Sequence, residues 1–346
     1  MFNALTSMGV DVGVAPFTTT GSNIGTAQVP DGRLEHLAQL SDSAKVVPAG
    51  LHVVDIAGLV SGASGGEGLG NQFLAQIREA DALSFVLRAF DDPAVTYATE
   101  PSDPAADLEV LETELCLTDL ESIETRLPKA QKKAESEKSG TAEVAAMSAA
   151  AEVLGDGVPL YRSALSAEQR MALRDQFLLT DKLVLYLVNI GEDQISEADE
   201  IEAALRKVVG EDATVATLCG ALEAEIAELD DAGERADLLG SYGLAEPAIG
   251  RVARAAYQAL GKRTFLTTGE KESRAWTIPA GATAKQAAGV IHSDFERGFI
   301  RAEIASYDEV VAAGGWDEAR KCGTARLEGK DYVVADGDVV EFRFNV

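Results

Sequence analysis

The chain has 346 residues, of which 46% are hydrophobic, a size and composition expected for two or three globular domains. Its 57 acidic and 30 basic residues give a net charge of −27, which excludes general attraction to DNA or RNA and leaves only a local basic patch for any RNA contact. No apolar run is long enough to cross a bilayer, no signal peptide opens the chain, and three isolated cysteines are typical of reduced thiols in a cytoplasmic protein.

The N-terminal part contains the first predicted elements. Residues 2–6 have the pattern of a helix interior, and the segment Pro16–Thr20 is a hydroxyl-rich loop of the kind that brings a threonine to a metal ion. The apolar run His52–Ile56 predicts a buried parallel strand that delivers Asp55, with Gly58 three residues later. In phosphate-binding folds such an aspartate supports Mg²⁺, and the glycine N–H approaches the γ-phosphate because no Cβ intervenes.

A strand predicted over Leu83–Phe90 is followed by a helical insertion. Pro128 is expected to kink or shorten its first helix, and residues 136–140 are expected to turn the chain into an alanine-rich helix over 141–154. These features predict an antiparallel helical hairpin. Five apolar residues of the first helix recur at steps of four and three, the spacing of a coiled-coil seam: Cys116, Leu120, Ile123, Leu127 and Ala130.

The chain returns to strands after the hairpin, through a helix that begins at the capping box of Ser166 and Gln169. The runs Leu183–Val188 and Thr214–Leu218 predict two more buried parallel strands. The first is followed by Asn189-Ile190-Gly191-Glu192, where a GTPase carries Asn-Lys-x-Asp to read guanine. The second is followed by Cys219-Gly220, where a base-cradling loop would lie. This alternation of strands and helices predicts an α/β fold with a parallel sheet.

The last segment, from residue 263, changes to short strands and turns. Strands are predicted over Ala275–Pro279, Tyr332–Val334 and Val339–Phe344, with a helix after Thr283. This pattern resembles a TGS module, a small β-grasp domain. Four arginines of the segment are candidates for a basic face that binds RNA: Arg274, Arg297, Arg301 and Arg343.

Four segments together resemble the YchF/Obg-like ATPase family: Asp55–Val60, Gly66–Asn71, Asn189-x-x-Glu192 and Asp336–Val346. The resemblance covers essentially the whole chain. It implies a Ras-like P-loop NTPase fold, incomplete at its N-terminus, with an inserted coiled-coil hairpin and a C-terminal β-grasp domain. The implied nucleotide-binding domain comprises residues 1–100 and 180–262, the hairpin residues 101–179, and the TGS domain residues 263–346.

The function implied by this resemblance is that of a Mg²⁺-dependent P-loop ATPase and ribosome-linked regulatory switch. Members resemble Ras-like GTPases but prefer ATP. By similarity Thr19 would ligate the metal, Asp55 would support it through water, and Gly58 would sense the γ-phosphate. The implied partners are ATP and the ribosome or its RNA, contacted through the hairpin and the TGS domain, with no membrane and no DNA.

The base-reading residues implied by the resemblance follow the two later strands. Asn189 and Ile190 would hold adenine, with the loop at Cys219 and Gly220 beside it. The Asp of Asn-Lys-x-Asp accepts hydrogen bonds from guanine, and adenine offers no such pair of donors on that edge. Glu192 would therefore withhold the guanine contact.

The catalytic position departs from the family. Leu59 stands where Ras-like enzymes place a water-orienting Gln, and the family instead has a His proposed to serve catalysis in a mobile loop. The aligned residue here is Tyr97. A phenol titrates near about 10, so Tyr97 cannot shuttle protons at neutral pH as His does.

A second departure concerns the phosphate loop. The family's loop ends in Gly-Lys-Ser-Thr just before the segment that starts at Met1, and no Gly-Lys followed by Ser or Thr occurs in the chain. A start assigned too far downstream and a true loss of the loop both explain this. The strand before the loop is central in Ras-like sheets, so its loss is expected to leave two ladders unpaired and ATPase activity absent. The alternative function is a nucleotide-free adaptor that binds RNA or the ribosome.

Overall fold

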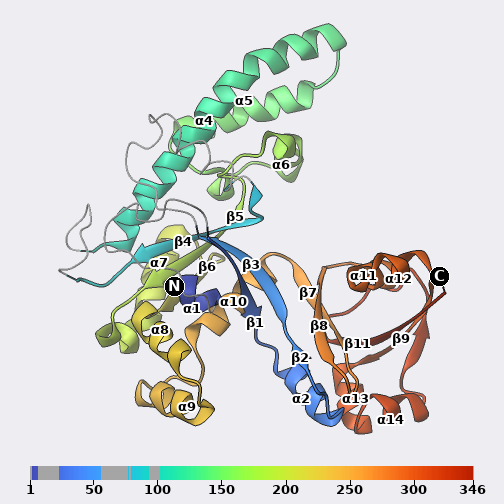
Figure 1. Cartoon of the computed structure of the whole chain (residues 1–346). Coiled ribbons are helices and arrows are strands. Elements are labelled where there is room, and N and C mark those ends of the chain that lie inside the picture. Colours follow the sequence, from blue (N-terminus) through green and yellow to red (C-terminus); the bar gives the residue numbers. More distant parts are fainter. Residues whose placement is uncertain (1, 7–22, 56–76, 78, 93–101, 346) are drawn as a thin grey trace. The chain divides into compact units, whose positions relative to one another are not determined.

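The computed structural model describes residues 2–6, 23–55, 77, 79–92 and 102–345 (Figure 1). The predicted site residues Thr19, Gly58 and Tyr97 lie outside these ranges. The described residues form two compact units. The first contains most of the chain between Val54 and Ala248, and the second contains Gly25–Val53 together with Ile249–Val346.

The first unit contains a three-stranded parallel sheet in the order β4-β5-β6. The strands are β4 (Ala82–Arg88), β5 (Leu183–Asn189) and β6 (Thr214–Leu218), so the buried parallel strands predicted over Leu183–Val188 and Thr214–Leu218 are confirmed. β5 lies in the middle and is buried on both faces from Val184 to Val188, as expected for a strand with helices on either side. The carboxyl ends of all three strands therefore meet at one edge.

Four helical segments follow these strands and bury their apolar sides in the same core. The core includes Leu205, Leu222 and Leu239 beside Leu87 and Val188 of the sheet. The segments are η4 (Glu192–Glu197), α7 (Ala198–Val209), α8 (Gly220–Glu228) and α9 (Ala232–Ser241).

The inserted helices form the predicted hairpin, whose two long helices lie side by side (Figure 1). The first helix runs through Pro128 to Glu137, so the expectation that Pro128 shortens it is wrong. Leu127 and Ala130 pack against the hairpin core on either side of Pro128, and this packing offsets the lost backbone hydrogen bond. The elements are α4 (Pro104–Glu137), α5 (Thr141–Gly155), η2 (Leu160–Arg162), α6 (Ala167–Leu173) and η3 (Arg174–Gln176).

The turn within the hairpin and the start of the helix that follows it obey local sequence rules. Gly140 has φ of +80°, a left-handed conformation that suits glycine, in the turn between α4 and α5. The predicted capping box at the start of α6 is confirmed, because the Ser166 hydroxyl accepts from the Gln169 N–H and the Gln169 side chain accepts from the Ser166 N–H.

The second unit is built on a six-stranded sheet in the order β10-β9-β11-β7-β8-β2. Phe265 and Leu266, neighbours in β7, are both fully buried, and they belong to two different cores on opposite faces of the sheet. The strands are β2 (Val46–Val47), β7 (Lys262–Thr267), β8 (Ser273–Pro279), β9 (Phe299–Ser306), β10 (Arg326–Glu328) and β11 (Asp338–Phe344).

Helices supply the second layer on each side of this sheet. The core around Phe265 contains Ala284 and Ala287 of α11 (Ala284–Ile291), with α12 (Ser293–Arg297) after it. The core around Leu266 contains residues of four other helices: α2 (Gly32–Leu40), α10 (Ala248–Ala259), α13 (Tyr307–Ala313) and α14 (Trp316–Lys321).

The predicted strand over Tyr332–Val334 is wrong. In that segment only Val333 makes a β-bridge, with Thr283. The Asp338 carboxylate accepts hydrogen bonds from the Ala335 N–H at 2.8 Å and from the Tyr332 hydroxyl at 2.9 Å. The Ala284 N–H donates to the Tyr332 carbonyl and the Val334 N–H to the Ala282 carbonyl, so the segment makes one bridge beside residues 282–284 and does not form a strand of the main sheet.

Two N-terminal strands form a separate two-stranded sheet, β1 (Asn23–Val29) and β3 (Ala49–Asp55). The strand predicted over His52–Ile56 is present as β3, but the expectation that it is buried is wrong, because its residues from Gly50 to Asp55 are exposed or partly buried. Val29 and Ala49 pack in the core around Leu266. The helix expected over residues 2–6 is present as α1 (Phe2–Thr6). In the described part of the chain, every helix is too short or too polar to span a bilayer.

Candidate functional site

The loops after β5 and β6 meet at the carboxyl edge of the parallel sheet. Asn189, the last residue of β5, is in register with Leu218, the last residue of β6. The side-chain oxygen of Asn189 accepts a hydrogen bond from the Gly220 N–H at 2.9 Å. One amide side chain thus joins the two loops that the sequence assigned to base recognition.

Gly220 allows this approach because it has no side chain. A Cβ on Gly220 would lie 3.1 Å from the Asn189 side-chain oxygen, closer than most real contacts of that kind. The preceding residue, Cys219, occupies the N-cap position of α8 and is 5% exposed. Burial raises the pKa of the Cys219 thiol, which therefore stays protonated at neutral pH.

Ile190 anchors the loop from the inside. Its N–H donates to the Leu218 carbonyl at 3.0 Å, and its side chain is 3% exposed within the core of the first unit. A ligand at the surface of this loop can therefore reach little of the Ile190 side chain. The contribution of Ile190 is to hold Asn189 at the edge.

Glu192 is exposed and is held by a residue distant in sequence. The Tyr242 hydroxyl, just after α9, donates to a Glu192 carboxylate oxygen at 3.0 Å, and this hydrogen bond raises the pKa of Tyr242. The loop is also closed by the Gly191 N–H, which donates to the Gln194 side chain at 2.8 Å. Sequence reasoning missed Tyr242, since nothing in its local pattern marks a partner 50 residues away.

Asp55 is the last residue of β3 and is partly buried. It is the described member of the predicted metal pair, whose other member is Thr19. Within the described ranges, no group of three or more His, Cys, Asp or Glu side chains could hold a metal ion. A single carboxylate at a strand end is nevertheless the kind of oxygen donor that Mg²⁺ uses while keeping most of its water ligands.

The described part of the site can fix one polar, planar ligand edge. It combines the amide of Asn189 with the backbone at the start of α8, beyond the carboxyl ends of parallel strands, while the Glu192 carboxylate is held by Tyr242. Ligands of open α/β sheets bind at this edge. The geometry therefore suits a heterocyclic base better than a metal cluster.

Two family models match the chain. Residues 1–115 match a family described as "50S ribosome-binding GTPase". Residues 263–345 match the YchF-GTPase_C family, described as "Protein of unknown function (DUF933)". Together these matches include the region of Asp55 and the whole C-terminal module.

Full-length relatives are similar to the chain throughout. Proteins named "Ribosome-binding ATPase YchF" are 44% identical in Escherichia coli O157:H7 and 42% identical in Bacillus subtilis, and each alignment covers 100% of this chain and 95% of the relative. The solved structure of the Schizosaccharomyces pombe YchF GTPase superposes with a TM-score of 0.80 at 30% identity. That superposition covers 95% of this chain and 89% of the other.

Proposed function

The chain belongs to the YchF family, whose bacterial relatives are named ribosome-binding ATPases, and from this premise we propose that it is a ribosome-associated P-loop ATPase that reads adenine with the Asn189 loop. The observation that carries the proposal is the hydrogen bond between Asn189 and Gly220, which joins the loops after β5 and β6. The joined loops present the Asn189 amide at the sheet edge where nucleotides bind in such folds.

Preference for ATP over GTP is assigned to Glu192. A GTPase has Asp at this position, and its short side chain accepts from the two donors of guanine. The longer side chain of Glu192 is drawn to the Tyr242 hydroxyl instead. Asn189, supported from inside by Ile190 and beside Cys219 and Gly220, then holds the adenine edge.

The metal site is proposed to combine Asp55 with Thr19. The oxygen donors of these two side chains suit Mg²⁺, which neutralises phosphate charge when bound. Gly58 would sense the γ-phosphate, and Tyr97 would stand near the attacking water. No Gly-Lys followed by Ser or Thr occurs in the 346 residues. We therefore expect the 346-residue chain, without an added phosphate loop, to bind ATP weakly and to lack ATPase activity.

Ribosome contact is assigned to the helical hairpin and the TGS domain, in the cytoplasm. The domain organisation behind this assignment is a nucleotide-binding domain of residues 1–100 and 180–262, the hairpin of 101–179 and the TGS domain of 263–346. RNA contact through the TGS arginines receives little support, because three of them form ion pairs: Arg274 with Glu272, Arg297 with Asp294 and Arg343 with Glu303.

Sedimentation with purified ribosomes tests the proposed function. The experiment compares the 346-residue chain with a version that carries a family phosphate loop ahead of Met1, each with a non-hydrolysable ATP analogue, with ADP or without nucleotide. We expect the loop-bearing protein to sediment with ribosomes in a nucleotide-dependent way. Absence of binding in every condition would contradict the proposal, and equal binding with and without nucleotide would favour the nucleotide-free adaptor.

A further inference from the structure

Tyr242 lies at the end of α9, where a helix-terminating motif fixes its backbone. The Leu244 N–H donates to the Leu239 carbonyl at 2.9 Å. The Gly243 N–H donates to the Gly240 carbonyl at 3.1 Å. These are the two hydrogen bonds of a Schellman motif, and Gly243 has the left-handed conformation that such a motif uses, with φ of +72°. The backbone of Tyr242 therefore has one defined place in the first unit.

The aromatic ring of Tyr242 is anchored as well. It is partly buried and packs against the core of the first unit, as do Leu238 and Leu244. The ring carries its hydroxyl to a position 3.0 Å from a carboxylate oxygen of Glu192. A donor that is already held in place loses little conformational entropy when it forms a hydrogen bond. Tyr242 is therefore the fixed partner of this contact, and the exposed side chain of Glu192 is the partner that adjusts.

Glu192 has a fixed backbone and an exposed side chain. It follows Gly191, whose N–H donates to the Gln194 side chain at 2.8 Å and whose carbonyl accepts from the Gln194 N–H at 3.1 Å. Among the residues that the structure describes, the Tyr242 hydroxyl is the only hydrogen-bond donor to the Glu192 carboxylate. The direction in which this carboxylate points thus depends on one hydrogen bond.

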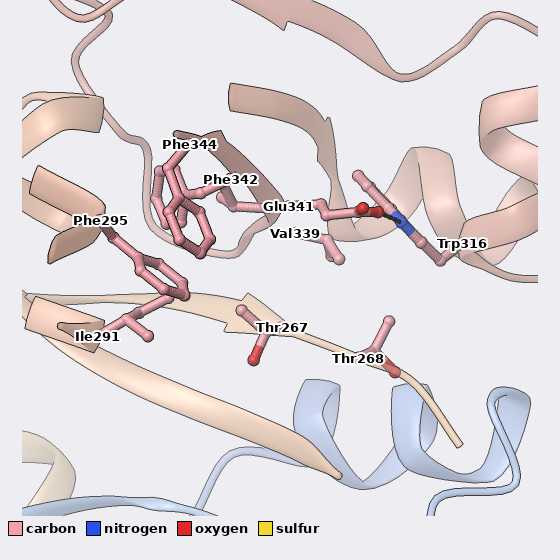
Figure 2. Close-up of a pocket in the computed structure, with 10 residues that line it drawn as sticks. Thr267, Thr268, Ile291, Phe295, Trp316, Val339, Glu341, Phe342 and Phe344 are labelled. Carbon is pink, nitrogen blue, oxygen red and sulfur yellow. Dashed lines mark hydrogen bonds between the residues drawn. The ribbon is translucent and has the colours of Figure 1, made fainter. Parts of the chain in front are cut away.

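Glu341 in the C-terminal sheet is an instructive contrast, because it is a carboxylate held by two partners. It borders a groove of about 320 Å³ beside β11 and accepts a hydrogen bond from the Trp316 indole at 3.1 Å (Figure 2). It also forms an ion pair with Arg320 at 3.2 Å, so the loss of either partner leaves the other in place. In the described ranges Glu192 has no ion pair, so removal of the Tyr242 hydroxyl would release its carboxylate.

The Glu192 carboxylate lies close to the loops assigned to base recognition. Burial raises the pKa of the Cys219 thiol, and the negative charge of Glu192 raises it further, so the two side chains are within electrostatic reach. Guanine presents two hydrogen-bond donors that a carboxylate accepts, and adenine lacks this pair. A Glu192 side chain that is free to turn toward the base would therefore favour guanine.

We propose that Tyr242 sets the base selectivity of the site by holding the Glu192 carboxylate away from the base. Tyr242 is a positioning residue, because it acts through Glu192 and not through contact with the nucleotide. The inference rests on the proposed function, since it takes the Asn189 loop as the base reader. It goes further in one respect: the greater length of Glu192 alone does not exclude GTP, and the hydroxyl at the end of α9 does.

Tyrosine NMR titration of the 346-residue chain tests the contact itself. The hydrogen bond to Glu192 raises the pKa of Tyr242, and the charge of Glu225 adds to this effect. Glu192→Gln should therefore lower the pKa of Tyr242 toward its ordinary value. Glu225→Gln is the matched control, because it removes an exposed carboxylate that is not bonded to Tyr242, and it should lower the pKa less. Equal lowering in the two variants would overturn the proposal.

Competition binding of ATP and GTP to the loop-bearing protein tests selectivity. Tyr242→Phe keeps the ring and removes only the hydroxyl. We expect GTP affinity to rise by about fivefold or more, the effect of one hydrogen bond, and ATP affinity to stay within about twofold. In a Glu192→Gln background the same change should leave the ratio of the two affinities unaltered, because an amide cannot accept from both guanine donors.

Tyr307→Phe is the matched control for the loss of a tyrosine hydroxyl. The Tyr307 hydroxyl contacts the His36 ring at 2.8 Å, and both residues belong to the second unit. This variant should leave the ratio of ATP to GTP affinity within about twofold. A larger shift would show that the ratio does not report on the Glu192 contact, and it would overturn the proposal.

Three further outcomes would contradict the inference. An unchanged ratio in Tyr242→Phe, with normal ATP binding, would overturn it and leave the proposed function intact. Equal changes in ATP and GTP affinity would reduce Tyr242 to a structural support of the loop, and a gain in GTP affinity that persists in the Glu192→Gln background would show that Tyr242 does not act through Glu192. Absence of ATP binding by the unaltered loop-bearing protein would instead overturn the proposed function, and the inference with it.

Discussion

The amide oxygen of Asn189 lies 2.9 Å from the backbone nitrogen of Gly220 and accepts its hydrogen bond. This contact joins the end of β5 to the first turn of α8, and a Cβ at residue 220 would intrude on it. The arrangement explains why the second loop has glycine at this position.

Gly220→Ala should disturb the joined loops. The added Cβ forces the Asn189 side chain to move, and we expect a loss of about 1 kcal/mol in the free energy of unfolding, the size of one hydrogen bond. The control is Gly240→Ala, because Gly240 lies within α9 with open space around it and alanine favours helix there by roughly 0.5 to 1 kcal/mol. Thermal unfolding measures both, and equal shifts in the two variants would contradict the assigned role of Gly220.

Asp119 should be important for the attachment of the hairpin. Its carboxylate is 1% exposed and accepts from the Leu179 N–H, the Thr180 N–H and the Thr180 hydroxyl, at 3.0, 2.7 and 2.7 Å. Asp119→Ala leaves these donors buried without their acceptor, and we expect a loss of roughly 2 to 5 kcal/mol in urea unfolding. Glu121→Ala, an exposed change on the same helix, should stay within about 0.5 kcal/mol. Similar losses in the free energy of unfolding for both variants would contradict this interpretation.

The three thiols should differ in reactivity. Burial, with help from the carboxylates of Glu112 and Asp119, raises the pKa of the Cys116 thiol to about 12, and burial also raises the pKa of Cys219. Cys322 is exposed. A raised pKa means less reactive thiolate at pH 8, so a disulfide reagent should rapidly modify one thiol in the native protein and all three in denaturant. Rapid modification of two or three thiols in the native state would contradict the packing described.

Tyr97→His should raise turnover in the loop-bearing protein by roughly 10²-fold, the lower end of what a positioned acid–base group contributes. We expect this increase because the Leu59 side chain cannot form a hydrogen bond to water, so another side chain must orient the attacking water. Steady-state ATPase assays at matched saturation measure the change. Turnover within about twofold of the Tyr97 protein, with unaltered ATP affinity, would show that this position is not catalytic.

Sequence reasoning succeeded where a local pattern determines the structure. β5 and β6 were predicted from their apolar runs to within one residue of their observed bounds, and the Ser166 capping box was predicted from two residues. Asn189 and Gly220 were assigned to the same site by the resemblance to the YchF/Obg-like family. Their hydrogen bond is consistent with that assignment.

Sequence reasoning failed where distant contacts decide. α4 continues through Pro128 because α5 packs along it, and Tyr332–Val334 makes a single bridge with Thr283 because its backbone is bonded to Ala282 and Ala284. The contact of Tyr242 with Glu192 could not be predicted from the sequence pattern either, since it depends on where α9 ends in space. In each case the controlling partner lies outside the window in which periodicity and propensity operate.

Competition between ATP and GTP for the loop-bearing protein tests the central claim most directly. Asn189 and Glu192 should favour ATP, and Glu192→Asp combined with Gly191→Lys should shift the preference toward GTP by about tenfold or more, because the shorter carboxylate regains the guanine donors. Lysine is placed at residue 191 and not at residue 190 because the Ile190 side chain is 3% exposed, where an ammonium group would be buried. A Cβ at residue 191 would lie 2.5 Å from the side-chain oxygen of Asp193, which is exposed and can rotate away. An unchanged ratio of ATP to GTP affinity in the double variant would contradict the claim that this loop reads the base.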